Sequence, residues 1–523
     1  MIALPMAEIE SGTPTTSAPN PWGFVPSLYF LQGLPVVIVQ SLSVTIYSTM
    51  GVPIEQIGLW TSLIAWPWTV KMLWGPLVDN TATKRAWILG MQALIIIALG
   101  LIAFAVTTPA FLPVTLAGFF LIAFLSATHD IAADGFYLLA LQEDKQAFFV
   151  GVRSAFFRMA MIFGPGVLVI IAGRIADSTT ASRAQVATSW QIALLIGTVV
   201  YALGWLWHLK GLPRPVGDPP RERFALAAVL LRFSQVLLML ATLLVSVQFL
   251  VMWFNFAATR PIDSVFWMVT GNDNTQNYWQ IPVGVIVVIL GVLSTRNMFA
   301  NIGMGPAAKE YFSQNRIVAI LAFIFFYRFG ESMIGKMNGP FLLATYQNGG
   351  LGVTTEMSGW LIGGVGVLAL TVGGILGGTV ISKYGIKSCI WPMVLSLNLP
   401  NIFYVWAAFT KPDLIGVAAV IAIDQYGYGF GFSAYMVYLM YLSQDSKFKT
   451  SHYAISTGLM ALGAMLAGIL SGYLLSAMMK EDPKMGYAWF FVAVCLFTIP
   501  GMLTLFFIPM DKEDLKVAPV ELD

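Results

Sequence analysis

Long apolar segments alternate with short polar stretches along most of the chain. A helix that crosses a bilayer needs about 20 mostly apolar residues, and fourteen segments meet this requirement. They lie at approximately 24–48, 55–78, 86–107, 111–141, 149–173, 190–209, 225–255, 279–295, 317–345, 356–382, 389–409, 414–442, 452–478 and 487–509. The pattern therefore predicts an all-α membrane protein with fourteen transmembrane helices.

The positions of lysine and arginine predict how these helices are oriented. With the N-terminus in the cytoplasm, 16 basic residues fall in cytoplasmic loops and 6 in external loops. Short cytoplasmic loops carry an excess of lysine and arginine, so both termini are expected in the cytoplasm. Residues 1–21 lack the basic segment that opens a secretory signal, and we expect a disordered tail there.

Two basic loops indicate an internal repeat. Residues 75–85 follow the second predicted helix, and residues 378–387 follow a much later one. Both resemble the loop between helices 2 and 3 of the major facilitator superfamily, which implies the major facilitator fold: two six-helix bundles, here with two extra helices. The predicted organisation is a cytoplasmic tail at 1–21, a six-helix bundle at 22–209, a basic linker with a two-helix hairpin at 210–316, a second bundle at 317–509 and a cytoplasmic tail at 510–523.

Composition excludes several other classes of protein. Hydrophobic residues make up 58% of the chain and charged residues 10%, whereas soluble domains carry roughly 25% charged residues. A net charge of +2 gives no basis for nucleic-acid binding. Cys389 and Cys495 lie in apolar segments, and their positions support neither a disulfide nor a metal site. With three histidines and no H-E-x-x-H or G-x-S-x-G motif, we expect no enzymatic activity and no cofactor.

Ionisable residues within the first predicted bundle are candidates for function, because a charge at membrane depth is costly unless it is paired or hydrated. Asp130 and Asp134 are four residues apart and share a helix face. Two such carboxylates raise each other's affinity for protons, which makes them the candidate proton site. Arg158 is a candidate partner for either one. Lys71, His129 and Arg158 are also candidate cargo ligands, although Lys71 can instead reach the cytoplasmic surface and His129 can be a packed polar residue.

The ninth predicted helix carries a second charged cluster. Arg328 and Glu331 are three residues apart and are expected to pair. Such a pair either neutralises both charges permanently or opens when Glu331 takes up a coupling proton, which frees Arg328 for an anionic cargo. Lys336 and Asn338 are further candidate ligands. The Gly-Pro pair after Asn338 is expected to unwind the helix and expose carbonyl groups.

Polar residues on two other predicted helices complete a central pathway. In the facilitator fold, the first and fourth helices of each half line the central cavity, and here these are predicted helices 1, 4, 9 and 12. The twelfth contains a run of glycines and aromatic residues that suits either sugar stacking or close helix packing. The candidate cargo ligands on helices 1 and 12 are Tyr29, Gln32, Gln40, Asp424, Gln425 and Tyr428.

Several strings of residues resemble the AmpG-type muropeptide permeases, in the peptide/acetyl-coenzyme A transporter branch of the superfamily. The strings are 31–35, 57–60, 71–79, 126–131 and 327–331. The resemblance implies proton-driven import of N-acetylglucosaminyl-1,6-anhydro-N-acetylmuramyl peptides across a bacterial inner membrane for peptidoglycan recycling. Departures from the family pattern at His129 and Asp424 leave the exact cargo open.

Three other functions remain to be separated from muropeptide import. A facilitator of this kind can carry another anionic cargo, such as a coenzyme A thioester, a peptide or a siderophore. A membrane-embedded enzyme and a non-transporting sensor are the alternatives from other classes, and a flux assay distinguishes them. We expect a monomer whose partners are a small-molecule cargo, protons and membrane lipids.

Overall fold

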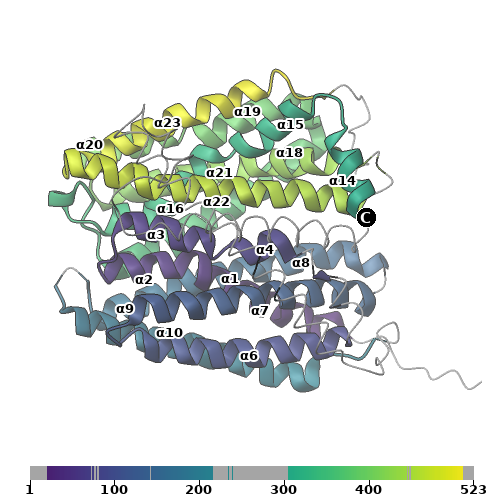
Figure 1. The fold of residues 1–523 in the computed structure, drawn as a ribbon, viewed down its shortest axis with the longest axis horizontal. Helices are drawn as coiled ribbons and strands as arrows, with labels where there is room; N and C mark the ends of the chain where they lie inside the picture. Colours follow the sequence, from purple (N-terminus) through teal and green to yellow (C-terminus); the bar gives the residue numbers. More distant parts are fainter. Residues whose placement is uncertain are drawn as a thin grey trace, which may run out of the picture.

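A computed structural model of the chain describes residues 20–71, 74–75, 78, 82–141, 143–178, 180–215, 234, 238, 304–444, 446 and 449–510. Within these residues, every regular element is a helix (Figure 1). Eleven helical stretches among them are long and apolar enough to cross a membrane. The prediction of an all-α membrane protein is therefore confirmed.

The first half of the chain forms a group of roughly parallel and antiparallel helices, drawn in purple and blue in Figure 1. Its buried apolar side chains build one large cluster. Its elements are η1 (Pro21–Gly23), α1 (Val25–Val37), η2 (Ile38–Leu42), α2 (Ser43–Thr49), α3 (Ile54–Leu63), α4 (Trp66–Val70), α6 (Lys84–Ala105), α7 (Phe111–Ala140), α8 (Glu143–Ile162), η4 (Phe163–Leu168), α9 (Val169–Ile175) and α10 (Arg183–Gly211).

The second half lies alongside the first and is drawn in green and yellow in Figure 1. It holds two further large apolar clusters. Its elements are α14 (Met304–Phe312), α15 (Ile317–Phe326), α16 (Phe329–Leu343), η5 (Tyr346–Asn348), α17 (Thr355–Gly359), η6 (Trp360–Gly366), α18 (Val367–Tyr384), α19 (Ile386–Asn398), α20 (Asn401–Thr410), α21 (Leu414–Tyr441), α22 (Lys449–Glu481) and α23 (Gly486–Thr504).

The number of fourteen helices stays a prediction. The second predicted helix is present as α3 and α4, with a turn at Ile64–Ala65 between them. The two extra helices predicted at 225–255 and 279–295 lie outside the described residues, apart from 234 and 238, and so do most of the two predicted tails.

The ninth predicted helix is interrupted at a different place from the one expected. α15 ends at Phe326, and α16 begins at Phe329 after a two-residue turn at Tyr327 and Arg328. The helix then continues through Pro340 to Leu343. The expectation that the Gly-Pro pair unwinds the helix is therefore wrong. A proline removes a single helical hydrogen bond, and the helix ends just one turn beyond it.

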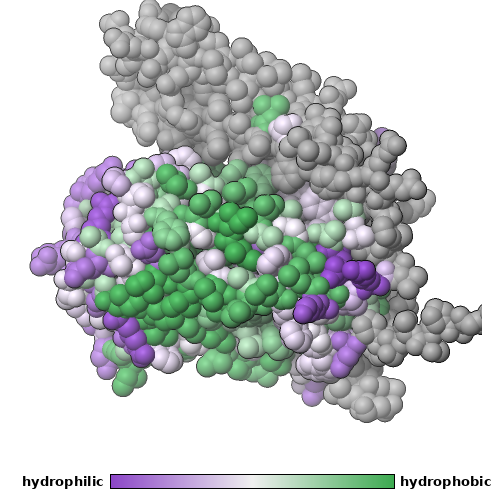
Figure 2. All heavy atoms as spheres, turned by 90° about the horizontal axis from the view of Figure 1, so that it is seen from below, coloured by the Kyte–Doolittle hydropathy of each residue, from purple (hydrophilic) through white to green (hydrophobic). Residues whose placement is uncertain are grey.

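The surface of the first half carries a broad apolar band. Figure 2 shows this band in green across the middle of the described face, with hydrophilic residues gathered toward both ends. On α6 and α10, large apolar side chains such as Leu101, Phe104, Leu203 and Trp207 are exposed. A soluble monomer rarely exposes so continuous an apolar surface, so the band is the surface expected to contact lipid.

Candidate functional site

A cavity of about 750 Å³ lies between the two halves and is lined by residues from both. The first half contributes residues of α2, α3, α4, α8 and their neighbours, and the second contributes α16, η6, α18, α21 and α22. The cavity gathers many of the residues singled out from the sequence. The predicted residues on its wall are Gln40, Lys71, Arg328, Glu331, Lys336, Asn338, Gln425 and Tyr428.

The fourth predicted helix does not line this cavity, contrary to the expectation for helices 1, 4, 9 and 12. α7 packs against α1 and α4, and none of its residues belongs to the cavity wall. The second and thirteenth predicted helices line the cavity instead. Sequence reasoning overlooked α22 because its lining residues are uncharged, as in the stretch from Ala454 to Met465.

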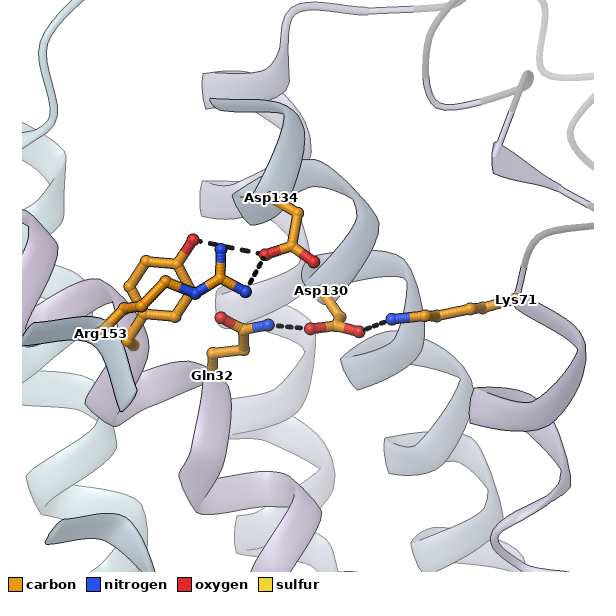
Figure 3. Close-up of polar contacts among 6 residues, drawn as sticks. Gln32, Lys71, Asp130, Asp134 and Arg153 are labelled. Atoms are coloured by element: carbon orange, nitrogen blue, oxygen red, sulfur yellow. Dashed lines mark hydrogen bonds and ion pairs between the residues drawn. The ribbon is translucent and has the colours of Figure 1, made fainter. Parts of the chain in front are cut away.

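Asp130 on α7 is joined to the cavity through one side chain. The ammonium of Lys71, which lines the cavity, forms an ion pair with Asp130 Oδ2. On its other side, Asp130 Oδ1 accepts a hydrogen bond from Gln32 Nε2 of α1, so the carboxylate lies between the two partners in Figure 3. In this structure Lys71 is therefore directed to Asp130, which favours its role inside the protein over the alternative in which it merely reaches the cytoplasmic surface.

One helical turn further along α7, Asp134 forms a second polar cluster (Figure 3). Arg153 Nη2 of α8 lies 3.1 Å from Asp134 Oδ1, and the Tyr29 hydroxyl donates a hydrogen bond to the same oxygen over 3.3 Å. The guanidinium carbon of Arg153 also lies 4.6 Å from the centre of the Tyr29 ring and 5.4 Å from that of Tyr137. Arg153 was missed from the sequence, although an arginine in an apolar segment is itself a signal.

Arg158 does not form the ion pair expected of it. Among the described residues, no ion pair joins it to Asp130 or Asp134, and Arg153 takes that place. The Arg158 guanidinium points instead toward the second half, where a Cβ added to Gly374 of α18 would lie 2.9 Å from Nη2. Arg158 is also absent from the cavity wall. The five-residue spacing between the two arginines turns them to different faces of α8.

His129 is part of the packing between helices and not of the cavity. Its Nε2 lies 3.0 Å from Gln92 Nε2 of α6, and the same glutamine contacts His208 Nδ1 of α10 over 2.9 Å. The other nitrogen of His208 lies 2.9 Å from Ser27 Oγ. All four residues are held within the first half, and His129 is 1% exposed. This arrangement fits the packed alternative for His129, and its role as a cargo ligand stays a prediction.

Arg328 occupies an aromatic box at the turn between α15 and α16. Its Nη2 donates a hydrogen bond to the Tyr428 hydroxyl over 2.7 Å. The guanidinium carbon lies 4.8 Å from the Tyr428 ring centre and 4.6 Å from that of Phe432. No ion pair joins Arg328 to Glu331 among the described residues. The expected pair is therefore not formed in this arrangement, and both charges face the cavity separately.

Glu331 and Asn338 are buried polar groups on the cavity side of α16. Glu331 is 4% exposed and Asn338 is 7% exposed. The side-chain oxygen of Asn338 is buried with no hydrogen-bond partner. Within the described residues, Glu331 has neither an ion pair nor a side-chain hydrogen bond with a protein group. Both side chains are available to a cargo, to water or to a proton, since both contribute to the wall.

Asp424 on α21 lies behind the cavity wall. It is 1% exposed, and its Oδ2 accepts hydrogen bonds from the Tyr404 hydroxyl over 3.1 Å and from Gln425 Nε2 over 2.9 Å. Its other oxygen is buried without a partner. Asp424 is thus related to the cavity as Asp130 is, through a lining neighbour, and it is not itself a lining residue.

Backbone contacts between glycines join the halves where α9 ends and α17 begins. A Cβ added to Gly363 of η6 would lie 2.1 Å from Gly166 Cα of η4, and one added to Gly173 would lie 2.2 Å from Glu356 N. The Glu356 carboxylate also forms an ion pair with Arg174, with 2.7 Å between Oε1 and Nε. No side chain larger than hydrogen fits at these two glycines without a shift of the backbone.

A second glycine contact joins α3 to α22. A Cβ added to Gly58 would lie 2.7 Å from Gly472 Cα. The Gly58–Gly472 and Gly173–Glu356 contacts lie next to the loops that follow α2 and α9, which the basic-residue distribution predicts to be external. The Gly166–Gly363 contact lies further along the same side of the interface, in η4 and η6. We call this end of the molecule the glycine-sealed end. The two halves are closed against each other there.

The described residues contain no group of three or more His, Cys, Asp or Glu that could hold a metal ion.

The family model described as the Major Facilitator Superfamily matches residues 27–450. An uncharacterized protein of Haemophilus influenzae is 23% identical over 94% of this chain and 95% of its own length. A Rickettsia felis protein named "Putative transporter AmpG 4" is 20% identical over 92% of this chain and 94% of its own length.

Solved structures of transporters share the fold. A D-xylose-proton symporter superposes with a TM-score of 0.60 at 11% identity, covering 93% of this chain and 97% of the other. A POT family transporter in complex with 5-aminolevulinic acid gives a TM-score of 0.58 at 14% identity, covering 94% of this chain and 96% of the other. At these identities, the likeness concerns the fold alone.

Proposed function

Since the chain belongs to the major facilitator superfamily, whose members named here are transporters, we propose that it imports cell-wall muropeptides. The cargo class is the N-acetylglucosaminyl-1,6-anhydro-N-acetylmuramyl peptides, carried from the periplasm to the cytoplasm with protons. The relatives named as AmpG transporters over most of the chain support this choice, as do the strings of residues that resemble that family.

The observation that carries the proposal is the cavity between the halves. Its volume of about 750 Å³ lies in the range of ligand-binding pockets, roughly 300–1,000 Å³. Three cationic side chains, Lys71, Arg328 and Lys336, contribute to its wall. Muropeptides carry peptide carboxylates, which such cations bind. Tyr428 and Trp68 add aromatic surface for sugar rings.

Arg328 is the proposed primary ligand for a cargo carboxylate. A guanidinium holds a carboxylate through two parallel hydrogen bonds, and the aromatic box of Tyr428 and Phe432 fixes its plane. Glu331 lies about one helical turn away, and among the described residues it forms no ion pair with Arg328 in this arrangement. In this proposal, Glu331 competes with the cargo for Arg328 in another state of the cycle and takes up a proton when the cargo is bound.

Asp130 is the proposed carrier of the coupling proton, with Asp134 as its neighbour. The Asp130 carboxylate depends on Lys71 for its cation, and Lys71 is also within reach of the cavity. An anionic cargo that attracts Lys71 removes that cation from Asp130, and a carboxylate without a cation binds a proton more readily. Cargo and proton are thereby bound together.

The proposed setting is a bacterial inner membrane with both termini in the cytoplasm. In that orientation, the glycine-sealed end faces the periplasm, and the cavity is closed to the periplasmic side in this structure. Transport then requires these glycine contacts to separate so that cargo can enter. The orientation rests on the 16 basic residues in predicted cytoplasmic loops against 6 in external loops.

Uptake into proteoliposomes tests this function. The purified chain is reconstituted, and a radiolabelled muropeptide is supplied outside with an inward proton gradient. We expect accumulation above the external concentration, which collapses when a protonophore is added. Transport of a coenzyme A thioester, a free peptide or a siderophore, without transport of muropeptide, would contradict the proposed cargo. The proposal that the protein is a transporter would stand. If none of these cargoes is transported, the proposal as a whole is contradicted.

A further inference from the structure

Lys336 forms a contact that crosses from one half of the molecule to the other. It lies on α16 of the second half, and its Nζ donates a hydrogen bond to Thr61 Oγ1 of α3 in the first half over 3.1 Å. Both residues line the cavity. The contact is therefore placed where the two halves meet, and it differs in position from the Arg328 box at the start of α16.

Within the part of the chain that the structure describes, the ammonium of Lys336 pairs with no carboxylate. Among the described residues, none of the ion pairs includes it, and a neutral hydroxyl is its hydrogen-bond acceptor. Glu331 lines the same cavity on the same helix but is not paired with it. A cation at membrane depth is stabilised by an anion or by water, so an anionic group brought to this side chain would stabilise its charge.

A second polar group, Ser62, follows Thr61 on α3. It is 2% exposed, and its buried hydroxyl has no hydrogen-bond partner among the described residues. Gly468 of α22 leaves room for both side chains, because a Cβ there would lie 2.2 Å from Ser62 Oγ and 3.2 Å from Lys336 Cε. The three helices α3, α16 and α22 thus meet at two polar groups. Among the described residues, the Lys336 ammonium has no anionic partner and the Ser62 hydroxyl has no hydrogen bond.

We propose that Lys336 and Ser62, with Thr61 positioning the ammonium, form an oxyanion-binding subsite between the two halves, which holds an anionic group of the cargo. The identity of that cargo rests on the proposed function, whereas the binding of an oxyanion does not. The Thr61 hydroxyl donates to the Ile57 carbonyl over 2.6 Å and accepts from Lys336, so it holds the ammonium in place. A carboxylate or phosphate oxygen accepts hydrogen bonds from the ammonium and from the Ser62 hydroxyl, which gives both groups a partner.

The subsite also connects occupancy to closure of the glycine-sealed end. Thr61 and Ser62 follow Gly58 on α3, and Gly468 precedes Gly472 on α22, so the same two helices form the subsite and the Gly58–Gly472 contact. An anion bound by both halves stabilises the arrangement in which they are adjacent. It therefore favours the state that is closed at that end.

The distance along α16 adds a requirement on cargo length. Arg328 and Lys336 are eight residues apart, which corresponds to about 12 Å along a helix axis. A cargo that occupies both subsites is elongated and carries an anionic group near each end. Muropeptides with more than one carboxylate meet this requirement, and a small monoanion does not.

Thermal unfolding of the full chain in detergent tests the subsite without a cargo. Sodium acetate and, separately, sodium methyl phosphate replace sodium chloride at constant ionic strength, and the melting temperature is recorded. We expect a saturable rise in wild type that is reduced in Lys336→Gln and in Thr61→Val. The rise is expected to persist in Lys336→Arg, which keeps the charge, and in Thr69→Val, the matched control on the same wall.

The two probes identify which oxyanion fits, and three outcomes are decisive. If the melting temperature rises equally in wild type and in Lys336→Gln, the proposed subsite is wrong. It is also wrong if neither probe raises the melting temperature of wild type. The expected pattern supports it even if no muropeptide binds, in which case the proposed cargo alone fails.

Equilibrium binding of a muropeptide then tests whether the subsite recognises the cargo. A muropeptide and its C-terminal carboxamide are compared on wild type and on Lys336→Gln. If that carboxylate occupies the subsite, amidation weakens binding about tenfold in wild type and has little effect in the variant. Equal losses in both proteins would point to another cation of the wall, so the same comparison is repeated with Arg328→Gln, which removes the charge. Amidation losses that persist in full in both variants would contradict recognition of the carboxylate by either cation.

Discussion

Lys71 and Asp130 form an ion pair in which the lysine lines the central cavity and the aspartate lies behind it on α7. The carboxylate that we assign to proton coupling therefore communicates with the cavity through a single cation. The same arrangement places the coupling group outside direct contact with the cargo. Competition for Lys71 is thus the physical link between cargo binding and proton binding in this account.

Replacement of Asp130 tests that link. We expect Asp130→Asn to abolish proton-driven uptake, because an amide cannot exchange a proton, while exchange of cargo across the membrane is retained. The measurement is uptake into proteoliposomes as a function of external pH, alongside counterflow. Glu356→Gln, which changes a carboxylate at the glycine-sealed end, is the control. If uptake by Asp130→Asn depends on external pH as it does in wild type, Asp130 is not the carrier of the coupling proton.

Arg153 and Arg158 are expected to behave differently although they lie on one helix. Arg153 contacts Asp134 and two aromatic rings, so Arg153→Met should slow uptake strongly. The side chains of this ion pair are 32% and 41% exposed, so its loss should cost about 1 kcal/mol of stability or less. The variant should fold, which a melting curve checks. If Arg158→Met reduces uptake more than Arg153→Met, the pairing in this structure is not the functional one.

Arg328→Lys should bind cargo more weakly by about 1–3 kcal/mol, the range for a charge-assisted hydrogen bond. Lysine keeps the charge but cannot form two parallel bonds or lie flat between Tyr428 and Phe432. Equilibrium binding of a muropeptide in detergent measures the loss. Affinity equal to that of wild type would mean that Arg328 is held in the box for structural reasons alone.

Glu331→Gln should bind cargo at least as tightly as wild type but turn over slowly. The substitution removes the group that we expect to compete for Arg328 and to take up a proton. Binding is compared with the rate of uptake in the same preparation. Weaker binding by Glu331→Gln would indicate instead that Glu331 contacts a positive group of the cargo.

The glycine contacts predict how the equilibrium between open and closed states responds to added volume. A Cβ at Gly363 would lie 2.1 Å from Gly166 Cα, whereas one at the adjacent Gly364 would meet only the Trp360 ring at 3.8 Å. Gly363→Ala should therefore hold the glycine-sealed end apart, and Gly364→Ala should not. The readout is labelling of a cysteine at Gln40, on the cavity wall, by an impermeant reagent added at that end. Equal labelling in both variants would show that the seal tolerates the added methyl group.

The sequence was sufficient for the fold and for several charged residues. Apolar segments of spanning length are a direct consequence of lipid as solvent, and charges inside them are rare enough to stand out. Lys71, Arg328, Glu331 and Lys336 were identified in this way and do line the cavity. Asp130 was identified for the same reason, although it stands one side chain behind the wall.

The sequence does not determine which neighbouring helix each polar side chain of α7 and α8 contacts. His129 and Asp130 are neighbours, yet one packs against Gln92 and the other contacts Lys71. Arg153 and Arg158 both lie in an apolar segment, and their charges give no means to choose between them. These orientations depend on how α7 and α8 pack against other helices, which is a tertiary property.

The break in the ninth predicted helix has a similar origin. Pro340 is the obvious local signal, but the helix passes through it. The interruption occurs at Tyr327 and Arg328, where the Tyr327 hydroxyl donates to the Gly431 carbonyl and Arg328 enters its aromatic box. Contacts with α21 therefore override local helix preference at this point.

Coupled flux through one preparation is the most direct test of the central claim. Proteoliposomes that contain a pH-sensitive dye are given an inward muropeptide gradient and no initial proton gradient. We predict that cargo entry acidifies the interior of wild-type vesicles, and that Asp130→Asn vesicles show no acidification. Muropeptide entry without any change of internal pH in wild type would contradict proton coupling, and acidification of equal size in Asp130→Asn would contradict the role of Asp130.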